Sequence, residues 1–277
     1  MPVAAANGLD LFYEESGSRS DPTLLLICGL GAQCTRYDED LVQGFVDLGL
    51  HVVRYDNRDA GLSTHLPVDA AYSLSDMAAD GMALLDALGI DSAHLWGSSM
   101  GGMIAQVMAI EHPARVRTLT SVMSNTGEMG YGNPEPELLA ELIESTKPAA
   151  DFDEAVEAAV RLAKAIGSPD YWDEEGQRAR QRAFLERNHD PAGTGRQLAA
   201  TFSSGSRSEG LVALDVPTLV IHGTADRLVT PSGGRRTAEL VPGARLVEVE
   251  GMGHDLIEPF WQTYLDSTGE LLAAGRR

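Results

Sequence analysis

The chain has 277 residues, of which 43% are hydrophobic and 22% charged, the composition of an ordinary folded protein with a sizeable core. Its formal net charge of −20 argues against nucleic acid and anionic membranes as partners, because both bind clustered lysine and arginine. No stretch has the roughly 18 uncharged apolar residues that a membrane span needs. Residues 1–7 hold no basic region followed by an apolar run, so we expect no signal peptide and a cytoplasmic location.

Two cysteines, Cys28 and Cys34, are too few for a disulfide framework, and no cysteine or histidine cluster has the spacing of a zinc site. Cys28 falls within an apolar run, where a cysteine packs as a small hydrophobic residue. We therefore expect neither a structural disulfide nor a bound metal.

The chain begins with a β-hairpin pattern, in which Val3–Ala6 and Leu9–Glu15 flank the pair Asn7-Gly8, which suits a type I′ turn. Strands and helices then alternate. The expected strands are Thr23–Cys28, His51–Tyr55, Ala93–Trp96, Leu119–Met123, Thr218–His222 and Leu246–Val249. The expected helices are Tyr37–Leu48, Ser73–Leu88, Met100–His112 and Gly233–Leu240. This alternation predicts an α/β fold with a mainly parallel, twisted sheet and helices on both faces.

The alternation stops between residues 126 and 209. This segment has no clear strand pattern but three helical ones, at Pro136–Ser145, Phe152–Ile166 and Glu174–Asn188. An independent C-terminal domain is not expected, because strand patterns resume afterwards. We predict a core formed by residues 1–125 and 210–277, with residues 126–209 inserted before the last two strands as a helical cap, or lid, over one edge of the sheet.

The pentapeptide Gly97-Ser98-Ser99-Met100-Gly101 stands between an expected strand and an expected helix. In that context the pattern G-x-S-x-G indicates a nucleophile elbow, a strained turn that exposes the serine hydroxyl. Gly97 and Gly101 supply room, because a Cβ at either position would crowd the neighbouring strand and helix. We therefore predict that Ser99 is a nucleophile at the carboxyl edge of the sheet. A serine-rich turn without chemistry is the alternative.

A serine hydroxyl needs a neighbouring base to become a good nucleophile. Among the seven histidines, the candidate is His254, which lies on a glycine-flanked loop after the last expected strand. His222 is the one serious rival, since it ends a strand next to a glycine.

The base in turn needs a carboxylate that fixes its tautomer. Asp226 follows the strand Thr218–His222 and should reach the same sheet edge, and the order Ser99, Asp226, His254 is the one expected for an elbow of this kind. Asp255 and Glu250 are nearer to the base in sequence, but neighbours at a strand end point in different directions. The predicted catalytic triad is therefore Ser99, His254 and Asp226.

Acyl transfer also needs two hydrogen-bond donors for its oxyanion. One is the backbone N–H of Met100, the residue after the nucleophile at a helix N-terminus. The other should come from the loop after the strand Thr23–Cys28, where Gly29 and Gly31 let the backbone approach closely. The N–H of Leu30 is our candidate.

With these segments the chain resembles the α/β-hydrolase superfamily over nearly its whole length outside the insertion. The matching segments are Cys28–Gly31, Tyr55–Ser63, Gly97–Gly102, His222–Asp226 and Gly251–His254. Within the superfamily the chain is most similar to bacterial polyketide methylesterases of the aclacinomycin methylesterase type. The resemblance implies the α/β-hydrolase fold and hydrolysis of a carboxylic ester beneath a helical cap, without metal or organic cofactor, but it does not fix the substrate. We expect a serine esterase that cleaves an ester of an apolar small molecule, such as a polyketide methyl ester or a macrolide, through an acyl-enzyme.

Other members of the superfamily stay open as alternatives. Ser99 in place of aspartate argues against haloalkane dehalogenases and epoxide hydrolases. The run Ser99–Gly102 is shared with carbon–carbon bond hydrolases, enol-lactonases and perhydrolases, although the loop Cys28–Gly31 lacks the Gly-Gly-Pro start common in the first group. A lactonase, a cyanohydrin lyase and a non-catalytic ligand-binding protein are the further alternatives. We expect Asp56-Asn57-Arg58 to form a structural ion-pair network near the site.

The sequence says little about the substrate. Gly29, Met129 and Met252 are the candidates for substrate contact, because methionines adapt to apolar pockets, and core packing is the alternative for the methionines. No lysine or arginine is placed clearly enough to argue for an anionic substrate. The expected partner is a small-molecule ester or lactone, and a homodimer stays open.

Overall fold

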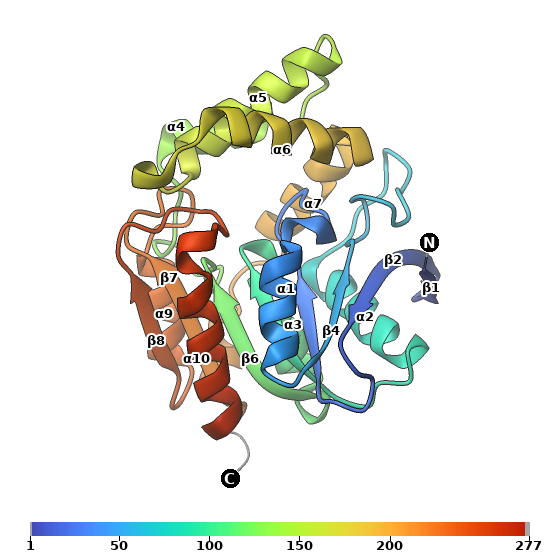
Figure 1. Cartoon of the computed structure of the whole chain (residues 1–277), viewed down its shortest axis with the longest axis vertical. Helices are drawn as coiled ribbons and strands as arrows, with labels where there is room; N and C mark the ends of the chain where they lie inside the picture. The colour runs from blue at the N-terminus through green and yellow to red at the C-terminus, as the bar shows by residue number, and fades with distance from the viewer. Residues whose placement is uncertain (1, 275–277) are drawn as a thin grey trace.

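The computed structural model describes residues 2–274, and in this part of the chain one eight-stranded sheet runs through the molecule (Figure 1). The strands lie in the order β1-β2-β4-β3-β5-β6-β7-β8. They are β1 (Val3–Ala6), β2 (Leu9–Ser16), β3 (Thr23–Ile27), β4 (His51–Tyr55), β5 (Ala93–Ser98), β6 (Val116–Val122), β7 (Thr218–Gly223) and β8 (Arg245–Val249). The pairs β1–β2 and β2–β4 are antiparallel and the remaining pairs parallel, so the prediction of a mainly parallel sheet is confirmed.

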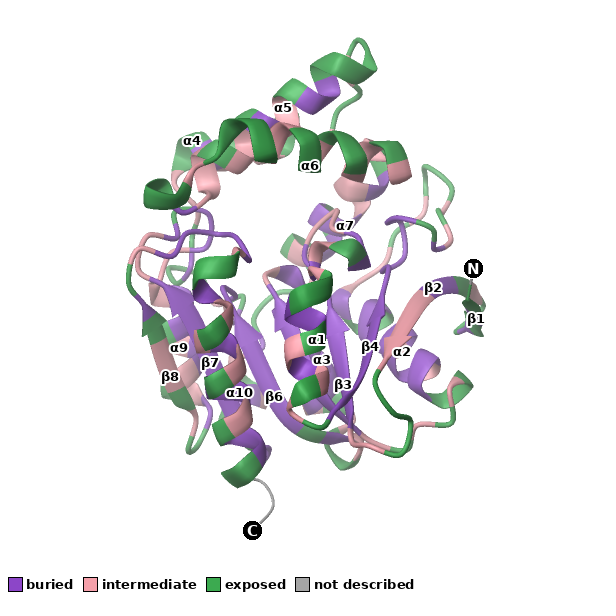
Figure 2. Cartoon of the chain, in the orientation of Figure 1, coloured by how far each residue is buried: buried purple, intermediate pink, exposed green. Residues whose placement is uncertain are grey.

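Helices cover both faces of this sheet. On one face lie α2 (Leu74–Ala87), α3 (Met100–Glu111) and α9 (Ser232–Leu240), and on the other α1 (Glu39–Asp47) and α10 (Trp261–Ala274). The apolar core accordingly forms two clusters, one on each side of the sheet. Figure 2 shows that the central strands are buried, whereas the helices of the outer layer carry many exposed residues. The central strands β3, β4 and β5 are buried along their whole length, which explains why they are short, nearly continuous apolar runs.

The hairpin at the start of the chain follows its turn chemistry. Asn7 and Gly8 have φ values of 52° and 77°, the positive signs that a type I′ turn requires. Ala6 pairs with Leu9 across the turn, so the predicted hairpin is confirmed.

Four helices between β6 and β7 lie across the carboxyl edge of the sheet, and we call them the helical layer (Figure 1). They are α4 (Pro136–Glu144), α5 (Phe152–Ile166), α6 (Glu174–Arg187) and α7 (Pro191–Ser203). The next helix, α8 (Ser208–Val212), packs instead against α3 and α9 of the core. Four 3₁₀ turns complete the described elements: η1 (Cys34–Arg36), η2 (Pro113–Arg115), η3 (Pro169–Tyr171) and η4 (Glu258–Phe260).

The sequence patterns predicted every strand, and the boundaries differ by a few residues at β5 and β6. Three helices were not predicted, namely α7, α8 and α10. The division into a core and a cap at residues 126 and 209 stays a prediction. Among residues 2–274, no helix has the length and apolar character needed to cross a bilayer.

Candidate active site

Ser99 occupies a sharp turn between β5 and α3. Its backbone has φ 56° and ψ −124°, a combination that residues with a Cβ rarely adopt. The turn is tight because its glycines have no room for a side chain: a Cβ on Gly97 would lie 2.1 Å from the Gly101 carbonyl oxygen, and one on Gly101 would lie 2.0 Å from the Ile27 carbonyl oxygen. Backbone contacts of this kind cannot relax, so the strained turn depends on both glycines.

His254 and Asp226 complete a hydrogen-bonded line that ends on the serine. The Ser99 Oγ lies 2.9 Å from Nε2 of His254, and Nδ1 of the same ring lies 2.7 Å from Oδ2 of Asp226. The other carboxylate oxygen of Asp226 accepts the N–H groups of Leu228 and Val229 at 3.0 and 2.9 Å. Because a carboxylate only accepts, the Nδ1 atom carries the proton and Nε2 is left to accept the serine O–H.

The rivals of these residues have other partners. His222 lies behind Asp226, where its Nε2–H donates to the Val229 carbonyl at 2.7 Å. Burial lowers the pKa of His222, so the ring is held neutral in a structural position. Asp255 accepts the N–H and the hydroxyl of Ser168 at 2.8 and 2.6 Å, which ties it to the helical layer rather than to the base.

The two predicted oxyanion donors lie beside the serine. Met100 is the first residue of α3, where the helix offers no acceptor for the backbone N–H. Leu30 follows β3 and, like Met100, lines the cavity described below. A Cβ on Gly29 would lie 3.1 Å from the Ser99 Cβ, so the absence of a side chain lets this loop approach the nucleophile.

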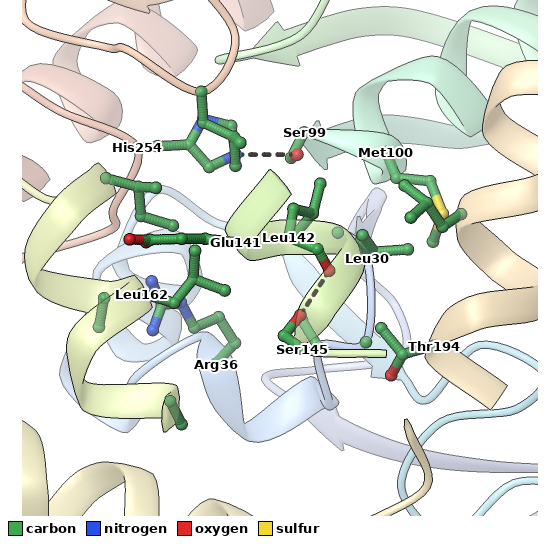
Figure 3. A pocket seen from close by; sticks show the side chains of 18 of the residues that line it. Leu30, Arg36, Ser99, Met100, Glu141, Leu142, Ser145, Leu162, Thr194 and His254 are labelled. Carbon is green, nitrogen blue, oxygen red and sulfur yellow. Dashed lines mark hydrogen bonds between the residues drawn. The ribbon is translucent and has the colours of Figure 1, made fainter. Parts of the chain in front are cut away.

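A cavity of about 690 Å³ lies between the sheet edge and the helical layer, and Ser99 and His254 open onto it. Figure 3 shows the histidine ring and the serine hydroxyl pointing towards each other on its wall. The helical layer contributes many apolar side chains, among them Leu139, Leu142, Leu162, Phe184, Leu185 and Leu198. A cavity of this volume and lining suits a small molecule with a large apolar surface.

Of the three residues predicted to contact the substrate, one lines the cavity and two do not. Gly29 lines the cavity. Met129 is 93% exposed on the outer surface, and Met252 is 0% exposed in the core, where it receives a hydrogen bond from the Tyr264 hydroxyl. Neither methionine is among the residues that line the cavity, so the expectation for these two is corrected: one packs in the core and the other faces solvent.

Several cations on the cavity wall were not singled out from the sequence, namely Arg36, Lys147, Arg161 and Arg180. Arg36 of η1 lines the cavity, and among residues 2–274 its guanidinium has no ion-pair partner within 4 Å. Burial lowers its pKa, while the charge of Asp255 opposes that shift. No sequence signal marks this residue, because the direction of its side chain is set by the 3₁₀ turn.

The expected network around Asp56-Asn57-Arg58 is present and structural. Asp56 accepts the N–H groups of Cys34 and Leu62 at 2.6 and 2.8 Å. Arg58 forms two hydrogen bonds with the buried carboxylate of Asp80, at 2.6 and 2.7 Å. These bonds hold the loops around the site in place.

Asp59, His65 and Asp190 are the group of described residues whose ligand atoms lie close enough to hold a metal ion. Their lone pairs are already engaged, since Arg196 pairs with Asp59 at 2.7 Å and His65 Nδ1 lies 2.6 Å from Asp190. Burial lowers the His65 pKa, but hydrogen bonds to the Gly61 carbonyl and Asp190 outweigh this and raise it. A metal ion would have to displace the contacts of Asp59 with Arg196 and of Asp190 with His65, so the group links the core to α7.

Comparison with known proteins agrees with this arrangement. The sequence matches the family described as alpha/beta hydrolase fold over residues 22–259. It is similar to rhodomycin D methylesterase DnrP of Streptomyces peucetius, with 31% identity over 89% of each chain, and to DauP of Streptomyces sp. (strain C5), with 30% identity over 89% of each chain. The solved enol-lactonase from Burkholderia xenovorans LB400 has a TM-score of 0.81 at 24% identity, covering 98% of this chain and 100% of that one. The chain therefore belongs to the α/β-hydrolase fold family of hydrolytic enzymes.

Proposed function

We propose that this protein is a serine-dependent hydrolase that cleaves a carboxylic ester of an apolar small molecule through an acyl-enzyme intermediate. The observation that carries the proposal is the hydrogen-bonded line from the buried Asp226 through His254 to Ser99, the last two of which line the cavity. Similarity to two rhodomycin D methylesterases over 89% of the chain supports an ester, and a methyl ester in particular.

In the acylation half of the reaction, Ser99 Oγ attacks the ester carbonyl while its proton passes to Nε2 of His254. The negative charge that develops on the carbonyl oxygen is stabilised by the N–H groups of Leu30 and Met100. Asp226 stabilises the imidazolium that forms. The C–O bond to the alcohol then breaks, and the leaving oxygen takes the proton from Nε2.

In the second half, water replaces the alcohol. His254 takes a proton from the water as its oxygen attacks the acyl carbon, and the same two N–H groups receive the oxyanion. Collapse of this intermediate returns the proton to Ser99 and releases the carboxylic acid. Each protein group ends the cycle in its starting state.

The helical layer acts in this proposal as the cap that selects the substrate. Its apolar side chains and the sheet edge enclose about 690 Å³, within the roughly 300–1,000 Å³ typical of small-molecule sites. A rigid polycyclic or macrocyclic methyl ester fits such a space better than a long flexible chain, because it loses less conformational freedom on binding.

The test is a fluorophosphonate probe followed by peptide mass spectrometry. The adduct should lie on Ser99 rather than on its neighbour Ser98, and Ser99→Ala should remain unlabelled and lose turnover of aryl and methyl esters. An intact protein that leaves Ser99 unmodified would contradict the nucleophile. Lactones are the comparison substrates, since ring opening gives one product and releases no alcohol.

A further inference from the structure

The loop that carries Leu30 is a four-residue turn. The Ala32 N–H donates to the Gly29 carbonyl at 3.2 Å, with Leu30 and Gly31 between them. Gly31 has φ +62° whereas Leu30 is not among the residues with positive φ, which is the combination of a type II turn. The Gly29 carbonyl and the Leu30 N–H belong to one planar peptide and point in opposite directions, so the bond to Ala32 also directs the Leu30 N–H.

The central peptide of this turn is held by Gln197 of α7. The Gly31 N–H donates to Oε1 of Gln197 at 2.7 Å, and Nε2 of the same amide donates to the Arg58 carbonyl at 2.7 Å. Gln197 is 0% exposed, so water does not compete for either bond. Loss of this anchor would leave the Gly31 N–H without its acceptor and free the turn to shift relative to the sheet edge.

The helix that supplies Gln197 is itself fastened to the core. Arg196 donates two hydrogen bonds to the carboxylate of Asp59, at 2.9 and 2.7 Å. On the other side, Thr194 lies against the turn, since a Cβ on Gly31 would be 2.9 Å from its hydroxyl oxygen. The turn is therefore in contact with α7 and fixed by it, while Gln197 lies behind the turn rather than on the cavity wall.

We propose that Gln197 is a positioning residue, which anchors the turn Gly29–Ala32 to α7 and thereby keeps the Leu30 N–H in place to reach the oxyanion. The seating of the helical layer is thereby coupled to transition-state stabilisation. This inference rests on the proposed function, because it concerns the oxyanion donor of that reaction. Gln197 acts through Gly31 and contacts neither the nucleophile nor the substrate.

The test replaces Gln197 by methionine, which has a similar length and suits a buried position but removes both hydrogen bonds. Removal of an oxyanion donor lowers kcat by about 10²–10³-fold, so a misdirected donor should cost roughly 10–100-fold in kcat with a smaller change in KM. A boronic acid transition-state analogue should bind the Gln197→Met variant more weakly by a similar factor. Gln197→Glu keeps an oxygen acceptor for the Gly31 N–H and should retain more kcat.

Hydrogen exchange of the peptide that covers residues 29–32 supplies a readout independent of turnover, and it should be faster in Gln197→Met. The matched control is Ser203→Ala, which removes a side-chain hydrogen bond to the Ala200 carbonyl within the same helix but does not touch the turn. Its kcat and exchange should equal those of the wild type.

Two results would overturn the inference: a folded Gln197→Met variant with wild-type kcat, or a fall in kcat without weaker binding of the analogue and without faster exchange at the turn. Circular dichroism and the melting temperature establish that the variant is folded. Failure of the proposed function looks different, since the wild type itself would then neither cleave esters nor take up the fluorophosphonate.

Discussion

The backbone strain at Ser99 can be measured as the difference in free energy of unfolding between two inactive variants, Ser99→Ala and Ser99→Gly. At φ 56° and ψ −124° a residue with a Cβ carries a conformational cost on the order of 1–3 kcal/mol, and glycine does not. Ser99→Ala keeps the Cβ and Ser99→Gly removes it. Both variants lose the hydroxyl and its hydrogen bond to His254, so that contribution cancels in the comparison.

The expected magnitude follows from two opposing contributions. Relief of a strain near 2 kcal/mol favours the glycine variant, while the extra freedom of glycine in the unfolded chain costs about 0.5–1 kcal/mol. Ser99→Gly should therefore be more stable than Ser99→Ala by about 1 kcal/mol, or roughly 2–4 °C in Tm for a chain of this size. The measurement is urea unfolding followed by circular dichroism, with thermal melts beside it.

Ser75 supplies the matched control. It is an exposed residue in α2, and both alanine and glycine at this position remove its hydrogen bonds to Glu111. Here glycine should be the less stable variant, by up to about 1 kcal/mol, because it is the poorer helix former. The reasoning is refuted if Ser99→Gly is no more stable than Ser99→Ala while the Ser75 pair behaves as stated.

The other predictions concern the base, the turn and the link to α7. Asp226→Asn should lower kcat by roughly 10³–10⁴-fold in steady-state assays of a cleavable ester, because an amide favours the wrong histidine tautomer. Gly101→Ala should give little soluble protein on expression, since its Cβ would lie 2.0 Å from the Ile27 carbonyl oxygen. Hydrogen bonds to Asp190 and the Gly61 carbonyl raise the pKa of His65 in the folded protein above its ordinary value of 6.5. These bonds therefore stabilise the fold fully at a pH below 6.5, and their contribution is lost as the pH rises through the raised pKa. In urea titrations across that range, His65→Gln should lose this part of the pH dependence; an unchanged profile would contradict it.

The fold and the approach of Ser99, Asp226 and His254 to one another could be predicted because their signals are local and the topology brings them together. Each strand of the parallel sheet ends at the same edge, so loops after β5, β7 and β8 deliver Ser99, Asp226 and His254 to one place. The register of the strands therefore suffices to place these three side chains within hydrogen-bonding distance of one another. The rival His222 lies behind Asp226, 3.6 Å from its Oδ2, but its Nε2–H donates to the Val229 carbonyl rather than reaching Ser99.

The cavity wall could not be predicted in the same way. Its residues come from helices whose mutual packing is set by contacts distant in sequence, and no register links them to the sheet. Met129 and Met252 were chosen for their chemical type, yet one is exposed and the other is in the core. Arg36 lines the cavity without any motif. By contrast, α10 carries helical apolar spacing at Trp261, Tyr264 and Leu265, a signal that the sequence does hold.

The helix α7 has a sequence with low helix propensity, yet it is packed closely against the core. It begins Pro191-Ala-Gly-Thr-Gly, and glycine is an unfavourable helix residue. Yet a Cβ on Gly193 would lie 2.6 Å from the Asp59 carbonyl oxygen, so helix propensity is given up for close approach to the core.

Two neighbouring stripes of residues on α7 face the core and the cavity. Gly193, Gln197 and Ala200 form a buried stripe against the core. Thr194, Leu198 and Thr201, each one position further along, line the cavity. Substitutions on the second stripe can change which ester fits. On the first stripe Gln197 accepts the Gly31 N–H, and Thr194 of the second stripe also lies against Gly31, so α7 contacts both the cavity and the turn that carries Leu30.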